Sequence, residues 1–330
     1  MPETFRALLV EEAQGETRAG FRDLRDEELP QGDTLVEVAF SSLNYKDALA
    51  VTGAGKVVRR FPMVPGIDLA GRILKSSDPS FKLGDLVLAT GCGLGETRWG
   101  GYAQRARVPS EWLVPLPRGL SLQEAMGLGT AGFTAMISLL ILEEHGVAPG
   151  GGEVVVTGAA GGVGSLCVAL LSALGYKVVA STGRLGETEF LKSLGASEVI
   201  GRETLPSLSR PLESEQWAGA VDSVGGATLA GILASASRHG CVVACGLAGD
   251  TGLKTTVFPF ILRGVTLAGV DSMATPMPRR RKAWERLAKE MPKSALASLM
   301  GIRPLSDIPA LSQEILAGKI RGRVVVDVSA

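Results

Sequence analysis

Several residue types are scarce in this chain of 330 residues. It has two His, four Cys and a single Asn, at position 44. Two His far apart in the sequence, and no Gly-x-Ser-x-Gly turn, give little support to a hydrolase triad. Four Cys in a chain this long do not form a disulfide framework. The near absence of Asn, a thermolabile residue, is typical of heat-adapted proteins.

The scarcity of Cys and His also argues against a metal site. Cys241 and Cys245 would lie about 13 Å apart along a predicted strand, too far to share an ion. Cys167 belongs to a predicted helix, and we expect all three thiols in the core. We therefore predict no metal, and any redox chemistry of this protein would have to come mainly from a bound organic cofactor.

Charge of one sign is lacking as well, because 34 Lys and Arg balance 34 Asp and Glu. This balance argues against a nucleic-acid binder, which normally has a strong basic excess. The uncharged residues 125–142 just reach the length of a membrane span, but Gly, Thr and Ser dilute them and no aromatic belt flanks them. We predict a buried helix there, no membrane association and no signal peptide, hence a cytoplasmic protein.

The chain exceeds the usual limit of about 250 residues for one core, which predicts two domains. Its first part is β-rich: residues 34–41 alternate apolar and polar side chains in the manner of a half-buried strand. From about residue 120, short apolar strands alternate with helical stretches. The predicted strands there are residues 154–157, 177–181, 198–200, 220–224, 241–245 and 265–270. This alternation predicts an α/β fold with a doubly wound parallel sheet, a Rossmann fold.

The strongest motif is a glycine-rich turn between a strand and a helix, at residues 154–175. Its residues 159–164 match the G-x-G-x-x-G fingerprint, with Ala159 in place of the first Gly. Gly161 lets the backbone approach a pyrophosphate, and Gly164 lets the helix pack closely on the strand. The start of that helix offers N–H groups and a positive dipole end to the phosphates. A glycine-rich turn with a strand before it and a helix after it predicts a site for a dinucleotide cofactor.

The end of the next strand indicates which dinucleotide is bound. An NAD site needs Asp or Glu there to bind the ribose 2′-hydroxyl, but this strand continues into Thr182, Gly183 and Arg184. Hydroxyls and a guanidinium suit a 2′-phosphate, which favours NADPH over NADH.

The sequence resembles the medium-chain dehydrogenase/reductase family, in its zinc-free, quinone-oxidoreductase-like branch. The resemblance rests on SLNYKD (42–47), VPGIDLAG (64–71), GGYA (100–103), LKSLGA (191–196) and the glycine-rich turn. Zinc-dependent members carry Cys where Asn44 stands and His-Glu where Ile67 and Asp68 stand. A closer similarity, to the acryloyl-CoA reductase subfamily, rests on NYKDALAVTG (44–53), FPMVPGID (61–68), GTAGFTAM (129–136), PFILRGV (259–265) and GVDS (269–272).

This resemblance implies an architecture. A GroES-like, β-rich catalytic domain would comprise residues 1–125 and 272–330, and a Rossmann NADPH-binding domain residues 126–271. It also implies a homodimer, with residues 265–270 as the edge strand through which two cofactor domains pair.

The resemblance further implies an activity and its residues. Subfamily members use NADPH to reduce the double bond of acryloyl-CoA, a short enoyl-CoA, to propionyl-CoA. Carried over to matching positions, the cofactor contacts would be Tyr45, Ala160, Gly161, Gly162, Val163, Thr182, Gly183, Arg184, Arg202, Leu247, Ile261 and Ser272.

Hydride transfer to the β-carbon would create an enolate, which hydrogen-bond donors stabilise and an acid protonates. Tyr45 is the best protein candidate for the acid; alternatively, Tyr45 positions the cofactor and water is the donor. Asn44 could polarise the thioester carbonyl, or it could cap a local turn.

Two basic clusters could bind the phosphates of the CoA substrate. Lys56, Arg59 and Arg60 form the first, and Arg279, Arg280, Arg281 and Lys282 form the second. Either cluster could equally be a solvated surface. The main alternative activity is that of an NADPH-dependent quinone or small-enone reductase, which needs only an apolar cleft.

Overall fold

The computed structural model describes residues 4–205 and 210–330, and the chain separates into two compact units. The first unit comprises Met1–Thr130, Met273–Ala288 and Ala297–Ala330, and the second comprises Ala131–Ser272 and Lys289–Leu296. One unit is β-rich and the other is built on a parallel sheet, as the sequence predicts. The predicted division at residues 125/126 and 271/272 stays a prediction.

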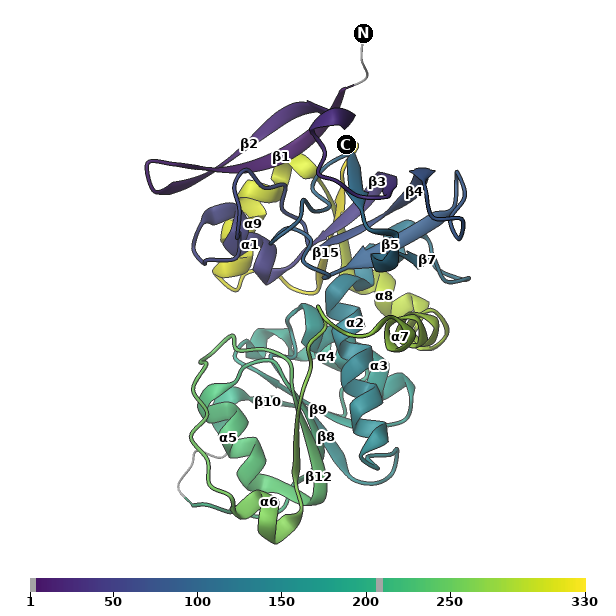
Figure 1. The fold of residues 1–330 in the computed structure, drawn as a ribbon. Helices are drawn as coiled ribbons and strands as arrows, with labels where there is room; N and C mark the ends of the chain where they lie inside the picture. Colours follow the sequence, from purple (N-terminus) through teal and green to yellow (C-terminus); the bar gives the residue numbers. More distant parts are fainter. Residues whose placement is uncertain (1–3, 206–209) are drawn as a thin grey trace. The chain divides into compact units, whose positions relative to one another are not determined.

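Mainly antiparallel strands build the first unit (Figure 1). β1 (Thr4–Ala13) and β2 (Glu16–Arg25) form a two-stranded hairpin. A seven-stranded sheet has the order β14-β15-β3-β4-β5-β7, with β6 paired to β3 outside this path. Its strands are β3 (Thr34–Leu43), β4 (Asp68–Ser76), β5 (Leu86–Thr90), β6 (Arg105–Val108), β7 (Val114–Pro115), β14 (Met300–Pro304) and β15 (Arg323–Asp327).

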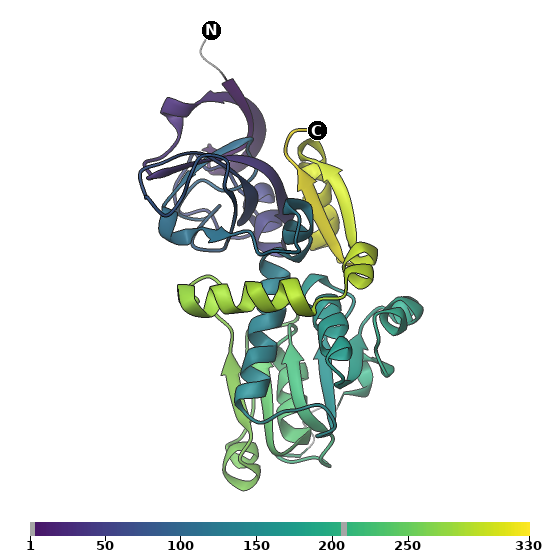
Figure 2. The same cartoon turned by 90° about the vertical axis from the view of Figure 1, so that its right-hand side faces the viewer.

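Alternating side chains explain how this sheet forms its core. In β3, Val36 and Val38 are buried while Glu37 between them is exposed, the period-two pattern of a strand with one face inward. The last strand, β15, pairs with β3, so the C-terminal part of the chain completes the sheet that the N-terminal part begins. Figure 2 shows the C-terminal strands β14 and β15 in yellow. Helices α1 (Tyr45–Thr52) and α9 (Ile308–Leu316) pack together beside them.

The second unit contains a six-stranded, all-parallel sheet in the order β10-β9-β8-β11-β12-β13. This order confirms the predicted doubly wound sheet, with β13 at one edge. Helices lie on both sides of the sheet, with α3 and α5 on opposite sides (Figure 1). The elements are β8 (Glu153–Thr157), α3 (Gly162–Ala173), β9 (Lys177–Thr182), α4 (Thr188–Ser193), β10 (Glu198–Gly201), β11 (Trp217–Asp222), α5 (Gly226–Ser235), β12 (Ala236–Ala244), α6 (Phe258–Arg263) and β13 (Thr266–Gly269).

The uncharged stretch noted in the sequence forms most of α2 (Leu122–Glu144). This helix is long and apolar enough to cross a membrane, but 94% of its most apolar window is buried inside the protein. The predicted buried helix is therefore confirmed. Its regular geometry breaks at Gly129, where φ is 52° and ψ is −155°. Two further helices, α7 (Met277–Glu290) and α8 (Lys293–Leu299), follow the last strand of the second unit along the chain.

Candidate functional site

A glycine-rich turn joins β8 to α3 at the carboxyl end of the parallel sheet. β8 ends at Thr157 and α3 begins at Gly162. A methyl group on Gly164 would lie 2.7 Å from the Cα of Ala159 and against the carbonyl oxygen of Gly158. Only glycine lets the first turn of α3 approach the strand this closely. The close packing predicted for Gly164 is confirmed.

The first turn of α3 can receive an anion. Gly161 is the N-cap of this helix, and Gly162 and Val163 are its first residues, all three partly exposed. The Gly161 N–H donates to the carbonyl oxygen of Gly158 at 2.9 Å. The amides of the first helical residues have no acceptor within the helix, and the dipole of the helix adds partial positive charge. With Ala160 beside them, these residues fit the pyrophosphate of a dinucleotide.

Strands β9 and β10 bring together residues predicted to bind the adenosine phosphate. Thr182 of β9 is in parallel register with Gly201 of β10, so the next residues, Gly183 and Arg202, lie side by side. A methyl group on Gly183 would lie 2.6 Å from Nη2 of Arg202. The guanidinium group of Arg202 therefore covers the chain just beyond the end of β9.

A second guanidinium group, that of Arg184, lies at the same end of β9. Its Nη2 donates a hydrogen bond of 2.9 Å to the carbonyl oxygen of Ala160 in the glycine-rich turn. Its backbone N–H donates to Oγ1 of Thr182, at 3.0 Å. Two guanidinium groups and a hydroxyl, with no carboxylate among residues 182–184, suit a phosphate rather than a free ribose hydroxyl.

Three other predicted cofactor contacts lie further along the second unit. Leu247 follows β12 and is 63% exposed, Ile261 lies on α6 and is 68% exposed, and Ser272 follows β13. Exposed apolar side chains of this size are available to a ligand, and their contact with the cofactor stays a prediction.

The first unit contains a buried polar network at the start of α1. Asn44 is the N-cap of this helix, and Asp47 is its third residue. The backbone N–H of Asn44 donates to Oδ2 of Asp47 at 2.9 Å, and the Asn44 side chain accepts from the Asp47 backbone N–H, which completes a capping box. Oδ1 of Asp47 accepts a hydrogen bond from the Ile67 N–H, at 2.8 Å. Asp47 thereby connects the start of α1 to the segment before β4.

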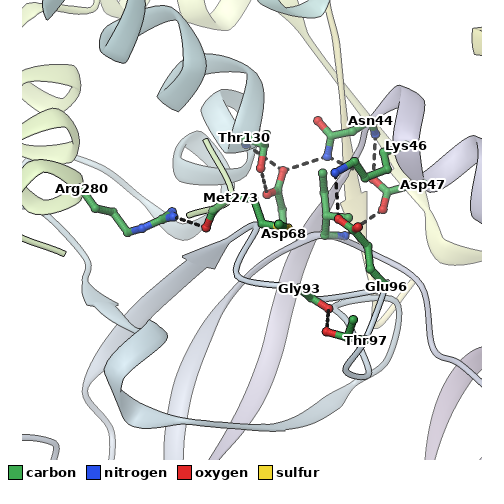
Figure 3. A network of polar contacts seen from close by, with 11 residues as sticks. Asn44, Lys46, Asp47, Asp68, Gly93, Glu96, Thr97, Thr130, Met273 and Arg280 are labelled. Carbon is green, nitrogen blue, oxygen red and sulfur yellow. Dashed lines mark hydrogen bonds and ion pairs between the residues drawn. The ribbon is translucent and has the colours of Figure 1, made fainter. Parts of the chain in front are cut away.

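The side chain of Asn44 is fully engaged within this network (Figure 3). Its Nδ2 lies 2.9 Å from Oδ2 of Asp68, 3.1 Å from Oδ2 of Asp47 and 3.2 Å from Oγ of Ser42. Its Oδ1 accepts a hydrogen bond of 3.2 Å from Nη1 of Arg323. Two N–H bonds facing three acceptors leave no donor for a substrate carbonyl. This geometry favours local capping, and the expectation that Asn44 polarises the carbonyl does not fit it.

Asp68 is the centre of the network and caps the second part of α2. Its Oδ2 accepts the Thr130 N–H at 2.9 Å, and its Oδ1 accepts the Thr130 hydroxyl at 2.6 Å. Ser42 donates its hydroxyl to Oδ2 at 2.6 Å. Gly129 makes this possible, because a methyl group there would lie 2.6 Å from Oδ2 of Asp68 and 2.8 Å from Nη2 of Arg323. The break in α2 thus exposes a helix N-terminus to a carboxylate.

The charges of the network lie inside the protein. Burial lowers the pKa of Arg323, against the opposing effect of Asp68 and Asp47, which favour its charged form. Burial, and then the charge of Asp68, raise the pKa of Asp47 from 3.8 to about 7, while hydrogen bonds from Ile67 and Asn44 oppose this rise. Nη2 of Arg323 has no hydrogen-bond partner within the described residues. The network therefore encloses one guanidinium and two carboxyl groups.

Tyr45 follows Asn44 directly but is exposed, unlike the side chains of this network. It is the first residue of α1, and it is 51% exposed, whereas Asn44 is 9% exposed. The capping box fixes the backbone on which Tyr45 stands. The network thus holds an exposed phenol at the start of a helix.

The predicted CoA-binding arginines divide into two groups. Arg59 and Arg60 are exposed, and Arg279, on α7, is partly exposed. Arg280 is 1% exposed, and its Nη1 donates to the carbonyl oxygen and Oγ1 of Thr90, at 2.7 and 2.9 Å. Its Nη2 donates to the carbonyl oxygen of Met273, at 3.1 Å. Arg280 therefore joins segments of the first unit, and the expectation that it binds a substrate phosphate is corrected.

No cluster of three or more His, Cys, Asp or Glu in the described part of the chain is placed to hold a metal ion. All four Cys are free thiols. Burial raises the pKa of Cys241 to about 11 and that of Cys245 to about 12, so both thiols are protonated near neutral pH.

Two family models of dehydrogenases match the chain. The model described as alcohol dehydrogenase GroES-like domain matches residues 30–118, and the one described as zinc-binding dehydrogenase matches residues 162–291. The chain belongs to the medium-chain dehydrogenase/reductase family and is an oxidoreductase. The predicted family and fold are confirmed.

Particular relatives extend over the whole chain. The chain is 53% identical to the probable acrylyl-CoA reductase AcuI of Escherichia coli, covering 98% of this chain and 100% of the relative. It is 50% identical to the acrylyl-CoA reductase AcuI of Ruegeria pomeroyi, covering 99% and 100%. The crystal structure of the YhdH oxidoreductase of Salmonella enterica in complex with NADP has a TM-score of 0.96 at 52% identity, over 98% of this chain and 99% of that one. That of Bacillus subtilis YhfP with NAD bound has a TM-score of 0.96 at 44% identity, over the same shares.

Proposed function

We propose that this enzyme uses NADPH to reduce the carbon–carbon double bond of acryloyl-CoA, giving propionyl-CoA. The observation that carries the proposal is the identity of 53% and 50%, over essentially the whole chain, with two proteins named acrylyl-CoA reductases. The choice of NADPH is supported by the relative crystallised with NADP and by the two guanidinium groups of Arg184 and Arg202 at the end of β9.

The reaction adds a hydride and a proton across the double bond. Bound NADPH supplies the hydride to the β-carbon. The electron pair of the double bond moves to the α-carbon and the thioester oxygen as an enolate, and the α-carbon then takes a proton. The balance is acryloyl-CoA, NADPH and one proton giving propionyl-CoA and NADP⁺.

Tyr45 is the residue we assign to the proton transfer. Its ring is half-exposed at the start of α1, where a phenol hydroxyl can reach a ligand. The alternative is that Tyr45 positions the nicotinamide and a water molecule donates the proton. Asn44, whose amide is occupied within the network, is a positioning residue that fixes the start of α1.

The exposed arginines Arg59 and Arg60 are the stronger candidates for the CoA phosphates. Both lie in one loop of the first unit. A hydrogen bond of 2.9 Å from the Arg59 N–H to the carbonyl oxygen of Glu96 anchors this loop. Arg279 is the remaining candidate on α7. We also propose that the enzyme is a cytoplasmic homodimer whose copies pair through β13, the edge strand of the parallel sheet.

A quinone or small-enone reductase is the second candidate function. It is favoured by the putative quinone oxidoreductase YhfP of Bacillus subtilis, which is 44% identical over 99% of both chains. The two functions differ in whether the substrate carries phosphates.

Oxidation of NADPH at 340 nm, with acryloyl-CoA, crotonyl-CoA or benzoquinone as the acceptor, tests the proposal. We expect saturable turnover with acryloyl-CoA and NADPH, and weaker turnover when NADH replaces NADPH. Turnover confined to benzoquinone would replace the first function by the second. The Arg59→Glu/Arg60→Glu variant should raise the KM for acryloyl-CoA and leave the KM for NADPH unchanged, with Arg303→Glu as a surface control.

A further inference from the structure

A lysine in the first turn of α1 pairs with an acid from another loop of the first unit. Lys46 follows Tyr45, and its Nζ lies 2.8 Å from Oε1 of Glu96 (Figure 3). A cation in the first turn opposes the dipole of its own helix, so α1 gains no stability from a lysine at this position. The Glu96 side chain is only 14% exposed, and the ion pair neutralises its charge there. The position of Lys46 is therefore explained by Glu96.

Glu96 also holds the loop of residues 53–62, the arginine loop, which carries the arginines proposed to bind the CoA phosphates. The carbonyl oxygen of Glu96 accepts a hydrogen bond from the Arg59 N–H at 2.9 Å. Three residues further on, Nε1 of Trp99 donates to the carbonyl oxygen of Pro62 at 3.0 Å. Because both contacts come from one short segment, the chain around Glu96 determines where the arginine loop lies.

The segment around Glu96 is a compact turn. The carbonyl oxygen of Gly93 accepts hydrogen bonds from the N–H groups of Glu96, Thr97 and Arg98, at 3.2, 3.0 and 3.1 Å. Oγ1 of Thr97 donates to the same oxygen at 3.3 Å (Figure 3). Gly93 has a φ of 83°, in the left-handed region that favours glycine. These contacts keep the side chain of Glu96, which reaches α1, in a fixed relation to its carbonyl oxygen, which reaches the arginine loop.

Other contacts fix the start of α1, where Tyr45 lies. The capping box holds its first turn, and Oδ1 of Asp47 accepts the Ile67 N–H at 2.8 Å. These contacts do not involve Glu96. Loss of the Glu96 side chain should therefore leave Tyr45 in place and release the arginine loop from α1.

We propose that Glu96 determines the preference of the enzyme for CoA thioesters by holding the arginine loop at a fixed distance from Tyr45. The reacting end of the substrate lies at Tyr45 and its phosphates lie at Arg59 and Arg60, so selection depends on the distance between these two places. Glu96 is a positioning residue: its side chain acts through Lys46, and its carbonyl oxygen acts through the backbone of Arg59. This role of Glu96 rests on the proposed reduction of acryloyl-CoA.

Two thioesters of different length test this role in the complete enzyme, at saturating NADPH. Acryloyl-CoA carries the phosphates, whereas acryloyl-N-acetylcysteamine has the same reacting group and no phosphate. Glu96→Met removes the charge and keeps a side chain of similar length. It should raise the KM for acryloyl-CoA by about tenfold, the lower end of what the loss of one hydrogen bond to a charged group costs. The kcat with acryloyl-CoA, and both constants for the short thioester, should change by less than about twofold.

The ratio of the two kcat/KM values does not depend on how much of a variant folds, so it separates positioning from stability. Glu153→Met is the matched control, because Glu153, the first residue of β8, pairs with Lys177 at 2.7 Å in the second unit. This control should leave the ratio unchanged. In an Arg59→Ala/Arg60→Ala background, Glu96→Met should raise the KM for acryloyl-CoA no further, because both changes act on the same contact.

Three results with Glu96→Met would overturn its role: an unchanged KM for acryloyl-CoA, an equal loss with both thioesters, or a loss that persists in the Arg59→Ala/Arg60→Ala background. A wild-type enzyme with equal KM values for the two thioesters would overturn it as well. A wild-type enzyme that reduces neither thioester would instead overturn the proposed function itself.

Discussion

The two units build their polar sites in opposite ways. In the second unit, the proposed cofactor site is almost one continuous stretch, from β8 through the glycine-rich turn to the end of β9, with Arg202 added from the end of β10. In the first unit, the network joins side chains far apart in the sequence, namely Ser42, Asn44, Asp47, Asp68, Thr130 and Arg323. A site made of adjacent residues can be identified in a sequence, whereas a site made by tertiary packing cannot.

The two sites also use charge differently. Arg184 and Arg202 are partly or fully exposed, so they can pair with a ligand. Asp68 and Arg323 are 0% and 4% exposed and are occupied by other parts of the chain. We propose that the exposed charges serve binding, whereas the buried charges fix the backbone that carries Tyr45. Four variants test this division.

The largest effect is expected from removing the buried cation. Arg323→Met leaves two buried carboxyl groups without their guanidinium, which should lower the free energy of unfolding by about 3–5 kcal/mol. Urea unfolding measures this loss. Arg303→Met is the control, since Arg303 makes a surface ion pair with Asp307, 3.8 Å long, whose loss should cost about 0–1 kcal/mol. Similar losses in both variants would mean that the network does not stabilise the first unit.

Tyr45→Phe should lower kcat with acryloyl-CoA by about 10², because the variant keeps the ring and loses the acid. Stability should change little, since the side chain is half-exposed. Steady-state kinetics at several pH values measure the effect. A variant with full turnover would remove Tyr45 from the acid role and leave water as the donor.

Gly129→Ala probes the contact between α2 and the network. The alanine would have to adopt a φ of 52°, and its methyl group would press on Asp68 and Arg323. We therefore expect the free energy of unfolding to fall by about 2–3 kcal/mol. Gly146→Ala shares the positive φ, at 80°, but its methyl group would meet nothing within 4 Å. The difference between the two losses isolates the close approach, and no difference would contradict its importance.

A smaller effect should appear in the pH dependence of stability. Folding raises the pKa of Asp47 to about 7, so the folded protein holds a proton that the unfolded chain releases above about pH 4. The contribution of Asp47 to the free energy of unfolding therefore decreases as the pH rises from about 4 to 7. The stability advantage of the wild type over Asp47→Asn should shrink across this range by at least about 1 kcal/mol, the equivalent of one pKa unit.

Asp78 supplies a control of opposite sign for this measurement. It is partly exposed, and hydrogen bonds, first from the Ser80 N–H, lower its pKa. Its contribution to stability is full above its ordinary pKa of 3.8 and is lost as the pH falls below that value. An advantage over Asp47→Asn that stays constant between pH 4 and 7 would show that Asp47 keeps an ordinary pKa.

The sequence predicts a strand or helix well where the pattern of apolar and polar residues within that element is enough to specify it. The predicted strand 154–157 corresponds to β8, and the predicted edge strand 265–270 to β13. The bounds of an element differ from the predicted ones where a turn follows it. The predicted strand 220–224 corresponds to β11 (Trp217–Asp222). It ends at Asp222 because this side chain accepts a hydrogen bond from the Gly225 N–H, at 2.7 Å, in the turn that follows.

Tertiary contacts account for what the sequence does not predict. Arg280 stands in a run of basic residues on an amphipathic helix, and only the packing of α7 shows that it is the one member directed inward, to Thr90. The break at Gly129 lies in an apolar run that favours a continuous helix, and only the fold shows that Asp68 caps the helical part that follows it. The departure of Asn44 and Asp68 from the zinc-ligand pattern is visible in the sequence, but their joint hydrogen bonding is not.

Isotope tracing tests the proposed reaction most directly. Acryloyl-CoA would be reduced with NADPH deuterated at nicotinamide C4 in ordinary water, and with unlabelled NADPH in deuterated water, and the propionyl-CoA examined by NMR. Hydride transfer to the β-carbon predicts cofactor deuterium at that carbon alone and solvent deuterium at the α-carbon alone. Cofactor deuterium at the α-carbon, or no labelled propionyl-CoA, would contradict it.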